Sequence, residues 1–223
     1  MLFWILWLIL TPLICIFLPT RIIGKKYIKT IKGKASIFAC NHQTMNDPII
    51  LKCRVNTRFK LVAKSGLFKS KFGKWFFTKL GAYPVNRGGN DISFVKNTLG
   101  FLKDQKSIVI FPEGTRVKVG ETVELKNGVS MFALKTDCYI IPAFFKKRTN
   151  PFVFNTLLIG EPFKFSDYEE LKDQKPSKEI LNTASNILSE KLSFLKNISI
   201  KGYKKLIKLK FKELKETEKM NKK

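Results

Sequence analysis

The sequence predicts an α/β fold, in which a mixed, mostly parallel sheet is flanked by helices. One observation predicts the fold class, and two others indicate a single folded domain. Short apolar runs alternate along the chain with amphipathic stretches, as in folds that alternate strands and helices. The length of 223 residues suits one domain with an ordinary hydrophobic core. A hydrophobic content of 44% argues against a disordered chain.

The first 20 residues predict a hydrophobic membrane-anchoring helix. Residues 1–20 carry no charged side chain and are rich in Leu, Ile, Phe and Trp. About 20 helical residues span roughly 30 Å, the thickness of a bilayer core. Basic residues without an acid follow from Arg21 to Lys34, which predicts a cell-membrane protein whose remaining chain lies on the cytoplasmic side. Pro12 and Pro19 leave open a helix that lies in one leaflet.

Strands and helices are expected to alternate after this basic segment. The apolar runs predict strands at 36–40, 59–63, 107–111, 138–145 and 155–159, with a shorter one at 83–85. The amphipathic stretches predict helices at 48–53, 71–79, 91–103, 128–135 and 176–195. Asp47 and Pro48 predict a helix start, with Asp47 as the cap and Pro48 as the first helical residue.

The chain is predicted to have three parts: the anchor at 1–20, a central domain at 21–165, and a C-terminal helical region with a basic tail at 166–223. Residues 201–223 hold ten lysines and three glutamates. Tyr203, Leu206, Ile207 and Leu214 fit one face of a helix, whereas residues 207–212 alternate with the period of a strand. A basic amphipathic helix and an edge strand with a solvated tail both remain open, and the helix would suit a membrane surface.

The charge and the cysteines limit the partners. A formal net charge of +25 attracts polyanions, which are nucleic acid, anionic lipid or an acidic protein. The chain lacks the aromatic-rich basic motif of single-strand readers, and we expect no nucleic-acid partner. Its four cysteines have no metal-knuckle spacing, and one histidine does not complete a usual zinc site. We therefore predict no metal and no cofactor.

His42 is the only histidine, and Asp47 is the first acidic residue of the chain. A histidine takes a proton near neutral pH, and a carboxylate holds its other ring nitrogen in the productive tautomer. This pair suits a reaction in which a hydroxyl loses its proton as it attacks a carbonyl. Cys40 is a rival, because an extended segment points Cys40 and His42 to one face and a thiolate can take an acyl group covalently.

Arginines near two glycines suit a phosphate. The guanidinium groups of Arg87 and Arg116 present planar donor forks that fit phosphate oxygens. Gly81 and Gly114 permit tight turns that would bring these arginines to the site. Acids are scarce in this half of the chain, so Glu113 is a candidate to orient an arginine or to bind a substrate hydroxyl.

Four blocks follow one another in the chain: Asn41-His42-x4-Asp47, Gly81 to Arg87, Phe111 to Arg116, and Ile140 to Ala143. In this order and spacing the chain resembles the glycerolipid acyltransferase superfamily, from about residue 31 to residue 163. The resemblance implies that His42 and Asp47 activate a glycerol hydroxyl, which attacks an acyl thioester directly. The absence of a Gly-x-Ser-x-Gly motif from the sequence agrees with a mechanism without an acyl-serine.

The resemblance also implies the roles of further residues. Arg87 and Arg116 would contact the phosphate of the acyl acceptor, while Glu113 and Gly114 would help to hold that acceptor. Lys64, at a strand end, would bind phosphate or stabilise an oxyanion. Pro142 would shape a strand end beside the site. Lys126-x-Gly128 matches a Lys-x-Gly of the family, whereas Gly66-Leu67 stands where the family usually has Glu-Leu, which puts the local loop shape in doubt.

The expected reaction forms phosphatidic acid from 1-acyl-glycerol 3-phosphate, with acyl carrier protein or acyl-CoA as the donor. Two alternatives remain. One is a related acyltransferase that uses another lysophospholipid or glycerol 3-phosphate, since a phosphate site suits each of these. The other is a basic membrane-tethered binding module without enzymatic activity, which the net charge alone supports. The oligomeric state is not predicted.

Overall fold

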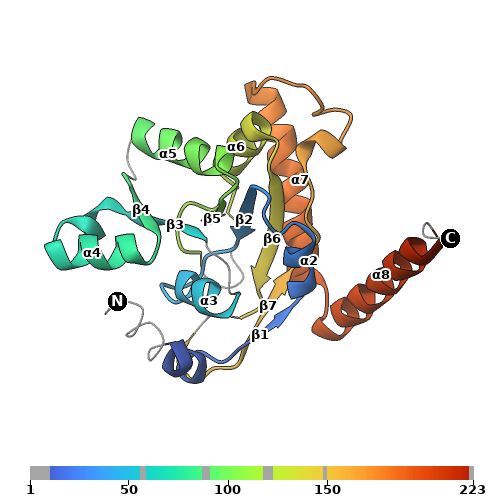
Figure 1. Ribbon diagram of the computed structural model, residues 1–223, viewed down its shortest axis with the longest axis horizontal. Helices are drawn as coiled ribbons and strands as arrows, with labels where there is room; N and C mark the ends of the chain where they lie inside the picture. The colour runs from blue at the N-terminus through green and yellow to red at the C-terminus, as the bar shows by residue number, and fades with distance from the viewer. Residues whose placement is uncertain (1–10, 56–58, 87–90, 118–122, 148–149, 221–223) are drawn as a thin grey trace.

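The computed structural model describes residues 11–55, 59–86, 91–117, 123–147 and 150–220 (Figure 1). Its described strands form one sheet in the order β1-β7-β6-β2-β5-β3-β4. The strands are β1 (Thr20–Ile23), β2 (Ser36–Cys40), β3 (Lys60–Lys64), β4 (Ala82–Val85), β5 (Ser107–Ile110), β6 (Tyr139–Phe145) and β7 (Asn155–Ile159). Neighbouring strands are parallel except β6 and β7. The predicted α/β fold with a mixed, mostly parallel sheet is confirmed.

The direction of the strands determines where functional residues gather. Strands β6, β2, β5, β3 and β4 run parallel to one another, so they all end at one edge of the sheet. We call this edge the carboxyl edge. Ligands of open α/β sheets bind in the crevice outside the carboxyl ends of the strands. The described candidate residues His42, Lys64, Glu113 and Arg116 all end or follow a strand at this edge.

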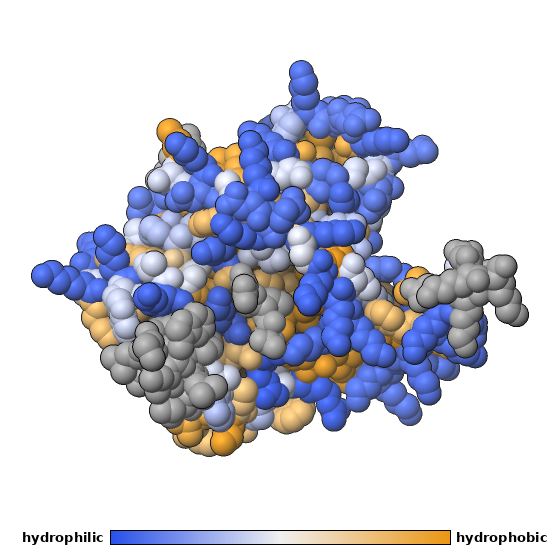
Figure 2. Space-filling view, in the orientation of Figure 1, coloured by the Kyte–Doolittle hydropathy of each residue, from blue (hydrophilic) through white to orange (hydrophobic). Residues whose placement is uncertain are grey.

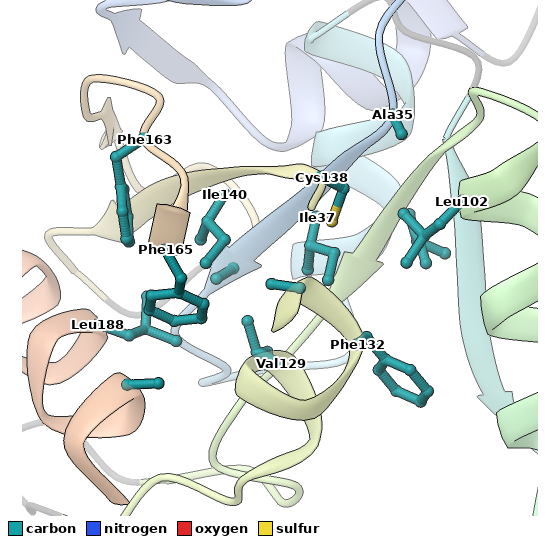
Figure 3. Close-up of a cluster of buried hydrophobic side chains, with 14 of the residues drawn as sticks. Ala35, Ile37, Leu102, Val129, Phe132, Cys138, Ile140, Phe163, Phe165 and Leu188 are labelled. Atoms are coloured by element: carbon teal, nitrogen blue, oxygen red, sulfur yellow. The ribbon is translucent and has the colours of Figure 1, made fainter. Parts of the chain in front are cut away.

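Helices cover both faces of the sheet. One face packs against α5 (Ile92–Lys103), α6 (Gly128–Thr136) and α7 (Lys178–Asn197). Figure 3 shows this core, where side chains of the strands meet those of the three helices. It labels among others Ile37, Ile140, Leu102, Val129, Phe132 and Leu188. The other face packs against residues 11–17, α2 (Lys25–Thr30), α3 (Asp47–Arg54) and α4 (Lys71–Lys79). Two 3-10 turns, η1 (Ser65–Phe68) and η2 (Phe165–Asp167), complete these layers.

The predicted strands and helices between residues 36 and 197 are all present, with ends within two residues of those predicted. Two elements in the basic segment were missed, β1 and α2. Gly24 joins them with φ +90°, and a Cβ there would lie 2.1 Å from the carbonyl oxygen of Ile159. Only glycine fits so close a backbone approach. The open question about the C-terminus is resolved in favour of a helix, α8 (Ile200–Met220).

The N-terminal prediction is only partly described. Residues 11–17 are helical, and Thr20 already belongs to β1. Residues 1–10 of the predicted anchor lie outside the described residues. Within the part of the chain that the structure describes, no helix has both the length and the apolar character needed to cross a membrane.

Candidate active site

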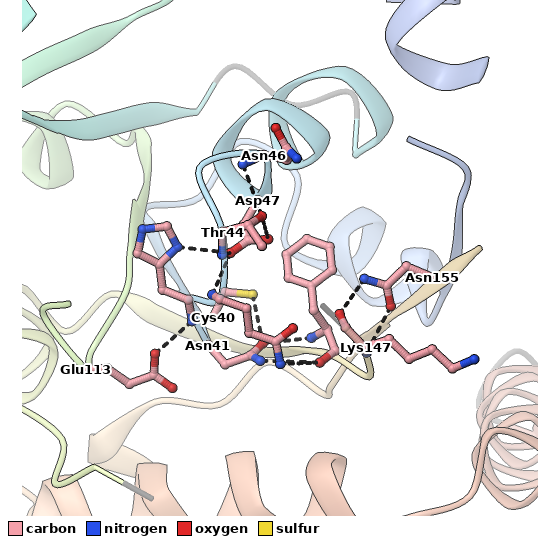
Figure 4. Close-up of polar contacts among 11 residues, drawn as sticks. Cys40, Asn41, Thr44, Asn46, Asp47, Glu113, Lys147 and Asn155 are labelled. Carbon is pink, nitrogen blue, oxygen red and sulfur yellow. Dashed lines mark hydrogen bonds and ion pairs between the residues drawn. The ribbon is translucent and has the colours of Figure 1, made fainter. Parts of the chain in front are cut away.

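The segment after β2 is held by its first residue, Asn41. The side chain of Asn41 accepts a hydrogen bond from the backbone N–H of Phe145 at 2.7 Å and donates one to its carbonyl oxygen at 3.3 Å (Figure 4). Phe145 ends β6, the parallel neighbour of β2. The amide of Asn41 thus extends the pairing of the two strands by one residue and fixes where His42 leaves the sheet.

His42 and Asp47 form a buried pair. Nδ1 of His42 lies 3.0 Å from Oδ2 of Asp47, and Asp47 is 0% exposed. The same oxygen accepts the backbone N–H groups of Gln43 and Thr44, each at 2.7 Å, and Oδ1 accepts the hydroxyl of Thr44 at 3.0 Å. These donors hold the carboxylate in place. Because an ionised carboxylate only accepts hydrogen bonds, Nδ1 of His42 carries the proton, and Nε2 is the ring nitrogen that can take one.

The role of Asp47 at the start of α3 differs from the prediction. Asn46 occupies the cap position, and Asp47 and Pro48 are the first two helical residues. The carboxylate of Asp47 reaches back to residues 42–44 and accepts their hydrogen bonds. The prediction of an Asp47 cap is therefore wrong, because the histidine loop that precedes the helix binds this carboxylate.

The loop after β5 packs against the histidine. The ring of Phe111 stacks on the imidazole of His42, with centroids 4.1 Å apart and planes 21° apart. Glu113 Oε2 accepts the backbone N–H of His42 at 2.8 Å, and the backbone N–H of Val117 donates to the carbonyl oxygen of His42 at 2.8 Å. The backbone of His42 is thus held on both sides by residues 113–117, and Figure 4 shows the side that Glu113 holds.

This contact places Arg116 beside the histidine loop. Arg116 directly precedes Val117, which is bonded to His42, and the side chain of Arg116 is exposed. Gly114 makes the turn with φ +70°, a conformation that favours glycine. A Cβ at Gly114 would lie 2.6 Å from Cε of Lys126, so the stem of this lysine lies over the turn. Lys126 is also held by its backbone N–H, which donates to Pro112 at 2.8 Å.

The remaining candidates lie around this centre or outside the description. Lys64 ends β3 with an exposed side chain. Arg87 is outside the described residues, two positions after the end of β4. Gly81 makes a turn with φ +76° directly before β4, and its predicted role in positioning Arg87 stays a prediction. Pro142 stands in the middle of β6, opposite Ala39, and does not shape a strand end as predicted.

Comparisons with known proteins identify the family. The family model described as Acyltransferase matches residues 20–146, which include the described site. The chain is 30% identical over 167 residues to the 1-acyl-sn-glycerol-3-phosphate acyltransferase of Bacillus subtilis, covering 72% of this chain and 81% of that protein. The chain belongs to the acyltransferase family. The resemblance drawn from the four sequence blocks is confirmed.

Two further acyltransferases are similar. The chain is 25% identical over 148 residues to the 1-acyl-sn-glycerol-3-phosphate acyltransferase of Streptococcus pneumoniae, covering 62% of this chain and 53% of that protein. The crystal structure of the 1-acyl-sn-glycerophosphate acyltransferase of Thermotoga maritima has a TM-score of 0.60 and 21% identity, over 81% of this chain and 73% of that one. This last likeness supports the fold of the acyltransferase.

Burial changes the acidity of Glu113 in this acyltransferase. Burial raises the pKa of Glu113 to about 6, and the charge of Asp47 adds to the rise. The hydrogen bond from His42 and the charge of Lys196 act in the opposite direction. Because the pKa of this carboxyl is higher in the folded protein than in the unfolded chain, its contribution to stability is present below about pH 4.5 and is lost as the pH rises through about 6.

Glu113→Gln is expected to remove this pH dependence, because the amide carries no charge and its carbonyl oxygen still accepts the N–H of His42. Thermal unfolding at pH 5 and at pH 7 measures it: Tm should fall less between the two for the variant than for the wild type. Glu113→Ala is expected to lower Tm at both pH values, since the N–H of His42 loses its acceptor. Equal pH dependence in wild type and Glu113→Gln would contradict this account.

Cys40 lies in the core rather than in the site. It is fully buried, and its thiol donates to the side-chain oxygen of Asn41 at 3.7 Å. Burial, followed by the charges of Asp47 and Glu113, raises the pKa of the Cys40 thiol well above its usual range. A thiol in such surroundings is a poor nucleophile, because the thiolate is the reactive form. The structure therefore disfavours Cys40 as the rival nucleophile.

Cys40→Ala is expected to keep acyl-transfer activity within about threefold of the wild type, because the thiol takes no part in the reaction and only a small packing change remains. Initial rates at equal protein concentration measure this. A loss as large as that of a His42 variant, in a protein that unfolds at the wild-type temperature, would restore Cys40 as a candidate nucleophile.

No metal site accompanies these groups in the described part of the acyltransferase. None of its His, Cys, Asp and Glu side chains gather in a group of three or more that would hold a metal ion. The sequence pointed to His42, Asp47, Glu113 and Arg116, which the structure places in or beside the histidine loop. Sequence reasoning missed Asn41 and Phe111 as supports of His42, although both stand in the sequence blocks, because their contacts depend on which strands are neighbours.

Proposed function

We propose that this acyltransferase moves a fatty acyl group from a thioester to the sn-2 hydroxyl of 1-acyl-glycerol 3-phosphate, forming phosphatidic acid in phospholipid biosynthesis. The observation that carries the proposal is the buried His42–Asp47 pair at the carboxyl edge, with the exposed Arg116 on the loop bonded to His42. The relatives from Bacillus subtilis and Streptococcus pneumoniae, named for this activity, support the choice of acceptor.

In the proposed mechanism His42 is a general base. Its Nε2 takes the proton of the acceptor hydroxyl as the hydroxyl oxygen attacks the thioester carbonyl. Asp47, bonded to Nδ1, stabilises the imidazolium that forms. The tetrahedral intermediate collapses, the carbon–sulfur bond breaks, and the imidazolium returns the proton to the departing thiolate. The acyl group passes directly to the acceptor, and His42 ends in its starting state.

The proposed acceptor site uses the charges around this base. Arg116 and Arg87 bind the phosphate, and Lys64 assists them or stabilises the oxyanion. Oε2 of Glu113 already accepts the N–H of His42, so we assign its Oε1 to the glycerol part of the acceptor. Gly114 keeps the turn that carries Arg116 free of a side chain.

The proposed location is the cell membrane. The apolar segment before β1 would anchor the chain, with the catalytic domain on the cytoplasmic side, because both acceptor and product are membrane lipids. The net charge of +25 would attract an acidic acyl carrier protein or the phosphates of acyl-CoA, so either donor fits.

A panel of acceptors and donors tests the proposed function. Membranes that contain the protein are given 1-acyl-glycerol 3-phosphate, lysophosphatidylcholine or glycerol 3-phosphate, each with acyl carrier protein thioester or acyl-CoA. The expected result is phosphatidic acid from the first acceptor, above the level in membranes without the protein. Preferred acylation of another acceptor would contradict the substrate assignment. Transfer to no acceptor would favour the binding module.

A further inference from the structure

Helix α8 is attached to the domain through one face. The hydroxyl of Tyr203 donates to the carbonyl oxygen of Ile159 at 2.6 Å, and Tyr203 is buried with Ile23, Leu158 and Leu195. Farther along the helix, the ring of Phe211 lies 5.2 Å from that of Tyr27 in α2. These contacts fix the rotation of α8 about its axis and therefore determine which of its side chains are exposed to solvent.

A row of lysines follows the exposed side of α8. The row contains Lys201, Lys204, Lys205, Lys208, Lys212 and Lys215. At 100° per residue their side chains fall within an arc of about 100°, and all six are exposed. We call them the lysine stripe. In the described chain, the one ion pair of the stripe joins Lys212 to Glu216 at 3.7 Å with both side chains exposed. Exposed ion pairs contribute little to the stability of a fold.

The basic surface continues from the stripe to the N-terminal segment. A groove of about 390 Å³ between α2 and α8 has Ile23, Ile207 and Phe211 among its apolar lining residues. Lys26 lines it together with Lys204, Lys208, Lys212 and Lys215. A neighbouring hollow adds Arg21 and Lys25, which follow closely after helical residues 11–17. Figure 2 shows hydrophilic side chains gathered over α8 and the adjoining part of the domain.

An exposed apolar side chain borders the stripe. Leu209 is 52% exposed and lies about 40° around the helix from Lys205, at the edge of the stripe. A helix with a lysine face and an exposed leucine at its border suits the boundary between headgroups and acyl chains of a bilayer. An acidic protein or a nucleic acid would use the charge, but neither needs this leucine or the continuity with residues 11–17.

The start of α8 is tied to the carboxyl edge of the sheet. Lys146 directly follows β6, and its ammonium group donates to the carbonyl oxygens of Leu195, Lys196 and Ile198 at 3.3, 2.5 and 2.9 Å. These carbonyls belong to the end of α7 and the link to α8. A surface that holds α8 would therefore also fix the distance of the active site from that surface.

We propose that the lysine stripe of α8 binds the surface of an anionic lipid bilayer, with the lysines over the headgroups and Leu209 at the acyl boundary. The proposal rests on the proposed function for its biological setting, in which acceptor and product are themselves anionic membrane lipids. It assigns to α8 a contact with the bilayer that is separate from the N-terminal segment.

Vesicle binding by two matched variants tests the proposal. The stripe variant changes Lys201, Lys205, Lys208 and Lys215 to Gln, and the control changes Lys96, Lys172, Lys175 and Lys178 to Gln. All eight side chains are exposed, and both full-length variants have a formal charge of +21, from 25 − 4. On vesicles of phosphatidylcholine and phosphatidylglycerol, the stripe variant is expected to bind about 100-fold more weakly than the control. Equal loss in both variants would overturn the proposal.

Tryptophan fluorescence provides a second readout at the helix itself. Leu209→Trp is expected to shift its emission to the blue when anionic vesicles are added, compared with the wild-type background and with pure phosphatidylcholine vesicles. Ile92→Trp, at a position that is 78% exposed on α5, is the matched control and is expected to show no shift. No shift for Leu209→Trp would overturn the proposal, and so would an equal shift in both variants.

The outcome is independent of the proposed reaction, since neither measurement uses acyl transfer. Binding through the stripe by a protein that transfers no acyl group would overturn the proposed function alone. Acyl transfer by a protein whose stripe and control variants bind anionic vesicles equally would overturn the role of α8 alone.

Discussion

His42→Ala is expected to lower kcat/KM for acyl transfer by about 10³-fold, roughly 4 kcal/mol of transition-state stabilisation, within the range for a general base. The variant removes the only imidazole of the chain, and the carboxylate of Asp47 does not replace it, because that carboxylate is buried and turned toward the backbone of residues 43 and 44. Initial rates of phosphatidic acid formation at equal amounts of membrane-bound protein measure the effect.

Asp47→Asn is the companion variant. It keeps the shape of the side chain but removes the negative charge that stabilises the imidazolium, and we expect a loss approaching that of His42→Ala. The double variant, measured beside both single variants, should lose little more activity than His42→Ala alone, because the two residues act as a unit. Losses that multiply in the double variant would contradict a shared role. So would wild-type activity of a correctly folded His42→Ala protein.

Arg116→Ala is expected to lower kcat/KM for 1-acyl-glycerol 3-phosphate by about 10- to 100-fold, as a hydrogen bond to a charged group contributes about 1.5–3 kcal/mol. The effect should appear mainly in KM for the acceptor. The same variant should act on 1-acylglycerol, which has no phosphate, as slowly as the wild type does. The ratio of kcat/KM for the two acceptors therefore measures the contribution of Arg116 to phosphate recognition.

Two controls sharpen the Arg116 result. Lys103→Ala removes one exposed positive charge at the end of α5, away from the carboxyl edge, and should leave the acceptor ratio unchanged. Arg116→Lys keeps the charge but loses the planar fork, so its ratio should fall between those of wild type and Arg116→Ala. An equal loss on both acceptors for Arg116→Ala would show that Arg116 supports the loop and does not recognise phosphate.

Much of the fold could be predicted from residues 36–197, because buried parallel strands read as short apolar runs and the helices between them are amphipathic. The basic segment misled the prediction. In β1 only the ends are buried, and Arg21 lies exposed between them, so the charge pattern concealed a strand that pairs with the distant β7. Pairing between residues so far apart leaves no local signal.

The site was predictable in its residue types but not in its contacts. The chemistry of His42 and Asp47 pointed to the pair, which the structure brings to 3.0 Å. The bond between Glu113 and the backbone of His42 was not foreseen, since it depends on β5 lying next to β2, with Ile110 opposite Ala39. Sheet order of this kind is set by the packing of the whole domain rather than by either segment.

Direct transfer of the acyl group to an acceptor activated by His42 is the central claim, and a trapping experiment tests it most directly. The protein is mixed with a radiolabelled acyl thioester without acceptor, and the mixture is divided into two samples. One sample is quenched with acid, and the other is chased with 1-acyl-glycerol 3-phosphate. The account predicts no covalently labelled protein, and labelled phosphatidic acid only after the acceptor is added, in the wild type and not in His42→Ala. A labelled protein whose acyl group passes into phosphatidic acid during the chase would contradict it.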